Sequence, residues 1–551
     1  PALPPWRRPE RGRFWKSLRL RDLRLYCYTL RYLKPKQVLF RLYYLMRRRW
    51  RRLSGFKYST AVSGRVAVLA DATRHLAPFI PSRIFLQGDT FTFLNLTRAF
   101  PGKIDWEFAE FGKLWQYNLS YFDYLLQPGM TREHGAALIR SFIEDAESDG
   151  AAYEPYPISL RTIHWIKFLL TTGAADAPEI NAALMAQYVR LLDHPEYHLL
   201  GNHLLENGFS LLFGGVYFDD ERLCRKASEI LQAELHEQIL PDGGHFERSP
   251  MYHQILLGRV LDCINLLKCF DRNPCRGMLP LLEEKAGGML GWLGQMTYRD
   301  GSIPLVNDAA YGIAPTTGEL TAYAERLGVG AVGASRLRES GYRKVSVGCY
   351  EVVLDVGDIG PDYIPGHAHA DTLSFELRVG GKPLIVDTGT STYEDNDVRR
   401  WQRSSMAHNT VMVAGLDQSE MWGSFRVARR AYVKAVEEGK NFIAASHTGY
   451  ERIGATHRRR FEFGDREIRI NDEVHSKKPY DCEAFLHFHP DVRLQVSPEG
   501  ILADGCKIVC DGAARIELEN YEYAPEFNRL IPAKMAVIRF RKNLETVIRF
   551  S

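Results

Sequence analysis

The chain has 551 residues, of which 45% are hydrophobic and 12% aromatic, enough to bury the cores of several domains. Its net charge of +4 conceals an asymmetry, because residues 1–52 hold seventeen Lys/Arg and two Asp/Glu, which leaves a net charge of −11 on the rest of the chain. An acidic body argues against a general nucleic-acid-binding protein. No uninterrupted apolar run reaches the roughly 18 residues of a membrane-spanning helix.

Residues 1–60 are predicted to form a basic N-terminal arm. Charges alternate with apolar residues in stretches such as Leu23–Tyr28 and Leu39–Tyr44, and the arm ends in the basic run Arg47–Arg52. Such patterns are typical of basic amphipathic helices. These helices would lie on an anionic membrane, hold an acidic polymer, or pack on their own domain.

Residues 61–335 change from short β-like pieces to a series of helical segments. The β-like pieces are Arg83–Leu86 and Phe91–Phe93. In the helical segments, apolar residues recur every three or four positions, as in packed amphipathic helices. Without alternating parallel strands, this order predicts a ring or stack of helical hairpins. The predicted helices are 136–147, 159–171, 179–192, 202–213, 220–239, 252–267 and 279–295.

Residues 340–551 contain short strand-like runs separated by turns such as Gly380-Gly381 and Asp504-Gly505. Short strands at this spacing predict an antiparallel sandwich, and the Gly-rich segment 328–342 is the expected boundary between the two halves. The predicted strands are 345–354, 373–379, 384–387, 410–413, 431–436, 442–447, 458–463, 467–474, 484–488, 508–510, 514–519 and 536–540.

The chain contains nine cysteines, an odd number, and no pair of Cys-x-x-Cys motifs that would indicate a zinc knuckle. Several of them have apolar neighbours, such as Cys263. We therefore expect reduced, buried thiols, which are typical of a reducing compartment.

The segment Gly366–Leu377 places two histidines two residues apart at the start of a strand-like run. Residues i and i+2 of a strand point to the same face, so His367 and His369 would share one surface, with Asp371 next in line. Two imidazoles on one surface can bind a metal ion, move a proton, or do both.

Two polar clusters lie in the helical half. Asn202, His203 and Glu206 stand at the start of a predicted helix, where Asn is also an ordinary N-cap. A Gly-rich loop full of polar groups then leads to a helix that opens at Pro250-Met251-Tyr252, with His253 next in the chain. A tyrosine at such a place could act as a general acid or base, although a single tyrosine is more often a packing residue.

The β half adds a carboxylate and a third histidine. An apolar strand ends at Asp387, where a charge is costly unless it is paired or bound to metal, and Arg403 and His408 lead into the following strand. Together, His369, Asp387 and His408 form two histidines and one carboxylate, which is a plausible Zn²⁺ site with an open position.

These motifs resemble the heparinase II/III-type polysaccharide lyases, which join an N-terminal (α/α) toroid to a C-terminal antiparallel β-sandwich, an α+β multidomain fold. The resemblance runs from about residue 114 to Trp422. It implies a toroid over residues 61–335 and a sandwich over 340–551. The most specific matches are Asn202-His203, Ser249–His253, His367–Asp371 and His408–Thr410.

Such lyases cleave uronic-acid polysaccharides by β-elimination, and the resemblance assigns roles to the matching residues. Asn202 and His203 would neutralise the substrate carboxylate, with Glu206 as an orienting group. Tyr252 would be the general acid, and also the base for one uronate epimer, whereas His367 would be the other base.

The resemblance also implies a cofactor and sugar contacts. His369, Asp387 and His408 would hold a divalent metal, for which Zn²⁺ is expected and Mn²⁺ and Ca²⁺ are alternatives. His253 and Arg403 are candidate contacts for sugar or sulfate groups. The two histidines of the motif should then point to opposite sides, one toward the metal and the other toward the cleft.

The expected partner is an acidic polysaccharide of the glycosaminoglycan type, such as heparan sulfate, chondroitin or hyaluronan. Alternatives are an alginate or exopolysaccharide lyase on the same fold, a toroid glycoside hydrolase with Asp242 and Glu206 as its carboxyls, and a non-catalytic polysaccharide-binding protein. No export leader is visible in the chain, so the bacterial cytoplasm or periplasm is the expected location. The sequence makes no prediction of oligomeric state.

Overall fold

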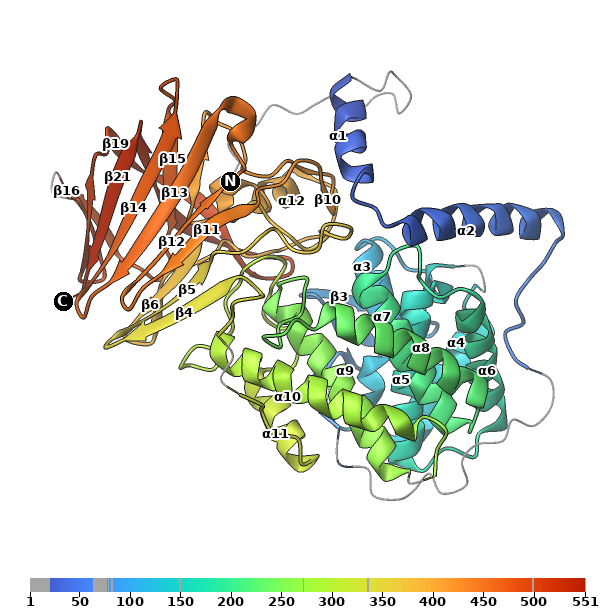
Figure 1. The fold of residues 1–551 in the computed structure, drawn as a ribbon. Coiled ribbons are helices and arrows are strands. Elements are labelled where there is room, and N and C mark those ends of the chain that lie inside the picture. The colour runs from blue at the N-terminus through green and yellow to red at the C-terminus, as the bar shows by residue number, and fades with distance from the viewer. Residues whose placement is uncertain are drawn as a thin grey trace.

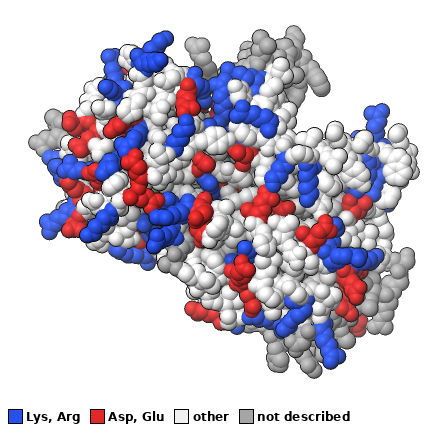
Figure 2. All heavy atoms as spheres, in the orientation of Figure 1, with Lys and Arg blue, Asp and Glu red and all other residues white. Residues whose placement is uncertain are grey.

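The chain folds into a helical half followed by a β-rich half (Figure 1). The structure is a computed structural model, and it describes residues 20–62, 77, 79–80, 83–147, 150–270, 272–333, 336–497 and 500–550. None of the described helices is both long and apolar enough to cross a membrane. Charged side chains of both signs are interspersed over the β half on the face shown in Figure 2.

Helices α1 (Leu20–Leu30) and α2 (Pro35–Leu53) form the arm, while residues 1–19 of the predicted arm lie outside the described residues. Pro35 stands in the first turn of α2, where its missing N–H is not needed. The buried amide of Gln37 donates to the carbonyls of Leu199 (3.0 Å) and Tyr363 (3.3 Å). One residue of α2 therefore touches both halves of the molecule.

The predicted β-like pieces form a small antiparallel sheet of β1 (Leu86–Gln87), β2 (Thr90–Phe93) and β3 (Leu96–Ala99). Phe93 packs edge-on against Trp115, whose indole donates to the carbonyl of Leu96 at 3.1 Å. This sheet therefore packs against α3 (Lys113–Tyr121).

Every helix predicted in the ring is present, and two further helices flank them. These two helices, α3 and α11, were not predicted because each is too short to repeat the apolar pattern more than a few times. Helix α11 does carry a capping box formed by Thr316 and Glu319. The ring helices are α3 (Lys113–Tyr121), α4 (Arg132–Asp145), α5 (Pro155–Thr172), α6 (Pro178–Asp193), α7 (Gly201–Tyr217), α8 (Glu221–Gln238), α9 (Pro250–Cys269), α10 (Leu279–Met296) and α11 (Thr317–Arg326).

Two cysteines contradict the expectation that all thiols are reduced. Cys224 in α8 and Cys275, which precedes α10, form a disulfide with their Cα atoms 5.2 Å apart. They are 51 residues apart in the chain, so only the folded arrangement of the helices shows that they meet.

Each predicted strand overlaps a strand of the β half, and the predicted run 345–354 is a hairpin that turns at Gly348-Cys349. A short helix, α12 (Asp397–Gln402), interrupts the strands. The strands are β4 (Tyr342–Val347), β5 (Tyr350–Asp355), β6 (Phe375–Val379), β7 (Lys382–Ile385), β8 (Val411–Val413), β9 (Met421–Trp422), β10 (Arg426–Val427), β11 (Val433–Glu438), β12 (Phe442–His447), β13 (Ala455–Phe463), β14 (Glu467–Ser476), β15 (Cys482–His487), β16 (Leu494–Ser497), β17 (Gly500–Ala503), β18 (Cys506–Asp511), β19 (Arg515–Glu526), β20 (Arg529–Phe540) and β21 (Asn543–Arg549).

Apart from the antiparallel pair β9-β10, the strands of the β half form one eight-stranded antiparallel sheet, ordered β11-β12-β13-β14-β21-β18-β17-β16, and two four-stranded sheets, β4-β5-β6-β7 and β19-β20-β15-β8. A bridge between Ile385 and Phe488 joins the two smaller sheets. They form a middle layer between the large sheet and the helical ring.

Alternate residues of the middle layer enter two different cores. Val352 and Leu354 of β5 join the core inside the sandwich, whereas Val353 between them joins the core of the helical ring. In β15, Leu486 likewise joins the core inside the sandwich, and Phe485 joins the core of the helical ring. Because successive strand residues point to opposite faces, one layer serves both halves, which fixes the toroid against the sandwich.

Candidate active site

The candidate site lies where the first turns of α7 and α9 meet the loop before β6. Asn202 follows Gly201, which has a φ of +60° and lies so close to Ile364 and Glu247 that a Cβ atom would come within 2.8 Å and 2.9 Å of their side chains. Glycine therefore permits the close approach of the two halves at this point.

His367 and His369 lie in that loop and not in a strand, so the expectation of one shared strand face was wrong. Strand β6 begins only at Phe375, and Leu373 before it has a φ of +66°. The predicted strand 373–379 is therefore strand only from Phe375 onward, and the segment from His367 to Ser374 is loop.

Asn202 and His367 belong to one buried network with Glu247. The Asn202 Nδ2 donates to Glu247 Oε2 at 2.8 Å and lies 3.5 Å from His367 Nε2. Glu247 Oε2 is 3.7 Å from the same His367 nitrogen. The structure thus brings the predicted carboxylate-binding amide next to the predicted base.

Tyr252 joins them from the first turn of α9. Its ring lies over the ring of His367 with centroids 3.9 Å apart, and its hydroxyl is 3.1 Å from that of Tyr393. Burial, together with the nearby Tyr393 hydroxyl, raises the pKa of Tyr252 well above the ordinary value. Tyr252 therefore keeps its proton at neutral pH, as a general acid requires.

Asp308 connects the two histidines, and the sequence analysis missed it. Its two carboxylate oxygens lie 3.0 Å from His367 Nδ1 and 2.8 Å from His369 Nε2, and Arg399 Nη2 donates to it at 2.7 Å. Burial alone would raise the pKa of Asp308, but Arg399 and the two rings hold that pKa well below the ordinary value.

The charge on Asp308 decides which nitrogen of each ring carries a proton. An ionised carboxylate only accepts hydrogen bonds, so His367 Nδ1 and His369 Nε2 are the protonated nitrogens. The lone pair of His367 is then on Nε2, beside Asn202. The lone pair of His369 is on Nδ1, which finds no hydrogen-bond partner among the described residues.

His203 and Glu206 lie farther along α7. His203 Nδ1 is 3.0 Å from Glu196, and burial lowers the pKa of this ring but the Glu196 carboxylate raises it, with a net rise above the ordinary value. The Arg259 Nε donates to Glu206 at 3.3 Å, and burial raises the pKa of Glu206. The Glu196 carboxylate thus favours the protonated form of His203, whose ring packs against Tyr156 with centroids 4.5 Å apart.

The three predicted metal ligands lie near one another, but they do not converge as a metal site. The rings of His369 and His408 have centroids 5.2 Å apart, and Asp387 accepts from His408 Nδ1 at 2.7 Å. The buried His408 Nε2, like His369 Nδ1, lacks a partner within the described part of the chain. In those same residues no group of three or more His, Cys, Asp or Glu could hold a metal ion. Two free imidazole nitrogens suit a borderline metal, and Asp387 serves here as a support for His408.

The structure gives His253 and Arg403 other roles than the expected sugar contacts. Both side chains are fully buried. The His253 ring lies between the carbonyl of Met289 and the amide of His245, and Arg403 donates to the carbonyls of Ala368 and Ser424. Arg403 thereby holds the loop that carries the two histidines.

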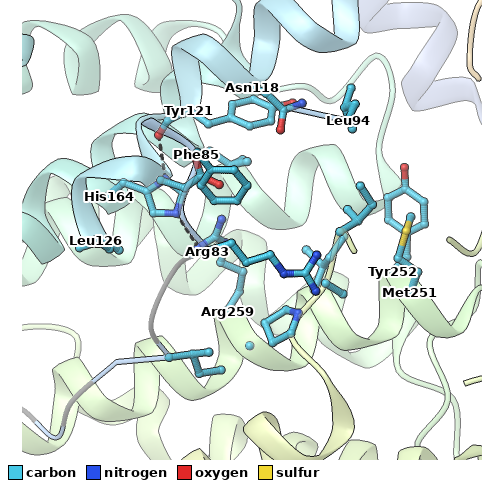
Figure 3. Close-up of a pocket in the computed structure, with 18 of the residues that line it drawn as sticks. Arg83, Phe85, Leu94, Asn118, Tyr121, Leu126, His164, Met251, Tyr252 and Arg259 are labelled. Atoms are coloured by element: carbon cyan, nitrogen blue, oxygen red, sulfur yellow. Dashed lines mark hydrogen bonds between the residues drawn. The ribbon is translucent and has the colours of Figure 1, made fainter. Parts of the chain in front are cut away.

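A cavity of about 250 Å³ opens inside the helical ring beside Tyr252 (Figure 3). Its wall includes the ring of Tyr156 and the Arg259 side chain, which lies 3.3 Å from His164. Tyr393 also lines it. Tyr252 is therefore shared between the cavity and the network of His367.

The structure does not bring together the two carboxyl groups, Asp242 and Glu206, that the glycoside hydrolase alternative requires. Asp242 accepts from the backbone and hydroxyl of Ser340 at 2.8 Å and 2.7 Å, while Glu206 is bound to Arg259. Neither carboxylate lines the cavity. A hydrolase needs two carboxyl groups that face one another across the bond to be cleaved.

Comparison with known proteins places this site in a family. A family model described as "Heparinase II/III-like, C-terminal" matches residues 331–551, and one described as "Heparinase II/III N-terminus" matches residues 175–323. The chain belongs to the heparinase II/III family. The family resemblance predicted from the motifs is confirmed.

Members of the heparinase II/III family are also found by sequence and by fold. A heparin-sulfate lyase of Bacteroides stercoris is 25% identical over 322 residues, which are 50% of this chain and 46% of that protein. The chain thus spans about half the length of this curated relative. Among solved structures, heparinase III has a TM-score of 0.61 at 18% identity and covers 82% of this chain and 80% of its own. A mutant of the heparan sulfate lyase of Pedobacter heparinus has a TM-score of 0.57 at 15% identity, over 84% and 81% of the two chains. The predicted toroid and β-sandwich are confirmed.

Proposed function

We propose that the protein is a polysaccharide lyase that cleaves a uronic-acid polysaccharide of the glycosaminoglycan type by β-elimination. The observation that carries this proposal is the meeting of Asn202, Tyr252 and His367 at one point beside the cavity. The names of the relatives, heparin-sulfate lyase and heparinase III, support the substrate class.

Elimination needs a base, an acid and a way to mask the uronate charge. The C5–H bond breaks as its proton passes to the base, the electron pair forms a C4=C5 double bond, and the C4–O bond breaks. The departing oxygen then receives a proton from the acid. Negative charge develops on the carboxylate of the sugar, so a hydrogen-bond donor placed there lowers the barrier.

Each of these parts has a candidate in the network. Asn202 has a second amide hydrogen beyond the one given to Glu247, and it can donate this hydrogen to the sugar carboxylate. His367 has its lone pair on Nε2 because Asp308 holds Nδ1–H, so it serves as the base. Tyr252, protonated at neutral pH, serves as the acid. His203, raised in pKa beside Glu196, adds positive charge near the substrate.

The first experiment is a panel of heparan sulfate, chondroitin sulfate, hyaluronan and alginate, followed by the ultraviolet absorbance of the unsaturated uronate product. We expect product from at least one of the glycosaminoglycans. Tyr252→Phe and His367→Ala should each lower the rate by about 10²-fold or more, because each removes a proton-transfer group.

Matched controls are available elsewhere in the chain. Tyr480→Phe removes a hydroxyl that donates to the carbonyl of Ile453, and His475→Ala removes an exposed ring on β14. Both should keep nearly the full rate. Near-normal rates in the two site variants would overturn the assignment, and new reducing ends without ultraviolet absorbance would indicate a hydrolase. Product from alginate alone would move the substrate class to alginate.

We also propose that His369 and His408 hold a divalent metal, with Zn²⁺ favoured because both ligands are imidazoles. Asp387 and Asp308 would orient their rings from the opposite nitrogens. The bound ion would keep the two loops of the sandwich together. Elemental analysis of the purified protein should find about one Zn²⁺ per chain, and His408→Ala should lose it, whereas His475→Ala should keep it. Equal metal content in wild type and His408→Ala would contradict this site.

A further inference from the structure

Helix α2 presents an apolar face to solvent. Its exposed large side chains are 44% to 81% accessible, and Leu39, Leu42, Met46 and Leu53 follow at spacings of three, four and seven residues, which places them on one side of the helix. The full set is Val38, Leu39, Leu42, Tyr43, Leu45, Met46, Trp50 and Leu53.

The opposite side of α2 is docked on the ring through polar groups and through the aromatic rings of Phe40 and Tyr44. The Tyr44 hydroxyl donates to the carbonyl of Pro195 at 2.6 Å. Arg47 and Arg51 bind the two carboxylate oxygens of Asp193 at 3.1 Å and 2.7 Å. This is the reverse of an ordinary surface helix, which buries its apolar side against the protein. Eight large apolar side chains on one exposed helix face mark a binding surface.

Positively charged side chains lie next to the apolar face of α2. Arg48, Arg49 and Arg52 are exposed, and α2 contains no acidic residue. By its position in the helix, Arg49 lies among the apolar side chains, and Arg52 lies at their edge. Where Figure 1 draws α2, Figure 2 shows white surface interrupted by blue patches.

We propose that α2 lies in the surface of an anionic lipid bilayer, with its apolar face among the acyl chains and its arginines among the headgroups. Trp50 and Tyr43 are side chains that favour the boundary between lipid and water. Long arginine side chains reach from an apolar surface to headgroup phosphates, which suits a cation such as Arg49 within the apolar face. In a dry protein interface the same charge would be costly without a buried partner.

The contacts of α2 with the rest of the protein also bring this helix close to the candidate site. Gln37, at the start of α2, holds the carbonyl of Leu199, three residues before Asn202, and that of Tyr363, four residues before His367. A bilayer bound to α2 therefore lies on the side of the molecule where both catalytic loops are anchored. This proposal does not depend on the lyase activity.

The test is co-sedimentation of the full chain with vesicles of phosphatidylcholine alone or mixed with phosphatidylglycerol. We expect binding to the anionic vesicles that weakens with added salt. The double variant Leu42→Asp/Met46→Asp should reduce the partition coefficient at least tenfold. Replacing Arg48, Arg49 and Arg52 by Gln should reduce it about fivefold for each charge removed.

A matched control places the same two charges on a different exposed apolar surface. Val496→Asp/Leu502→Asp on β16 and β17 should leave vesicle binding unchanged. Absence of binding to anionic vesicles, or equal binding by the α2 double variant, would overturn the proposal. So would binding to neutral vesicles at the same strength. A dimer in solution that is lost in the α2 double variant, without vesicle binding, would assign the face to a second copy of the chain instead.

Discussion

Asp308 is the residue that gives the two neighbouring histidines different chemistry. One carboxylate binds Nδ1 of His367 and Nε2 of His369, so the free lone pairs are on different nitrogens. The lone pair of His367 lies beside Asn202, whereas that of His369 has no hydrogen-bond partner among the described residues. In the proposed scheme, the same motif would provide a base toward Asn202 and a metal ligand toward His408.

Changing Asp308 to Asn should therefore impair catalysis more than binding. An amide can donate to His367 Nδ1, which favours the wrong ring tautomer, and we expect kcat to fall about 10²-fold with little change in KM. Steady-state kinetics on the best polymer would measure this. Thr390→Val removes another hydrogen bond to the same carboxylate without touching either ring, and it should stay close to wild type. Equal effects of the two changes would contradict the role of Asp308.

The catalytic candidates could be named from sequence because they lie in local motifs, whereas Asp308 could not. It follows the short apolar stretch Leu305-Val306, just as Asp387 follows a strand, but nothing local shows that both histidines fold onto it. Arg399 and Glu247 were missed for the same reason. Their roles come from contacts between segments far apart in the chain.

At the scale of elements, strands β13 and β14 are linked to the candidate site through one buried ion pair. Arg459 binds Asp472 at 2.7 Å and also donates to the carbonyls of Leu373 and Asn409, in the two loops that carry the histidines. Burial raises the pKa of Asp472, but Arg459 and His457 lower it to about 2. The sequence analysis predicted both strands but not this link.

Asp472→Asn should lower the free energy of unfolding by about 3 kcal/mol at pH 7, because it leaves Arg459 buried without a counter-charge. The folded-state pKa is depressed, so the wild-type contribution is complete above the unfolded value of about 4. It is lost as the pH falls from there toward 2, and the difference between the two proteins should shrink over that range. Urea unfolding at pH 7 and near pH 3 would measure it, and Glu522→Gln at an exposed site of β19 serves as the control. A difference that does not change with pH would contradict the charge argument.

At the scale of the whole molecule, the toroid and the sandwich share the middle layer of strands. Residues of β5, β15 and β20 alternate between the two cores. The spacing of apolar residues predicted both halves, because such residues recur every three or four positions in a helix and every second position in a strand. They could not predict this sharing, because a strand buried on both faces loses the alternation that would reveal it.

The shared layer predicts that the two halves unfold together. Phe461 is buried inside the sandwich, and Phe461→Ala should cost about 3–5 kcal/mol. Amide hydrogen exchange measured by mass spectrometry should become faster by a similar factor in α7 and in β13. Val436→Ala, at an exposed site of β11, should leave both rates unchanged. Faster exchange in β13 alone would show two independent units.

The disulfide between Cys224 and Cys275 has an effect in the unfolded chain as well as in the folded one. It closes a loop of 51 residues that contains Glu247 and Tyr252. By restricting the denatured ensemble, a cross-link of that length contributes about 4 kcal/mol to stability. A reductant in the surroundings would therefore lower the stability of the toroid through the segment that carries the proposed general acid, without touching the candidate active site.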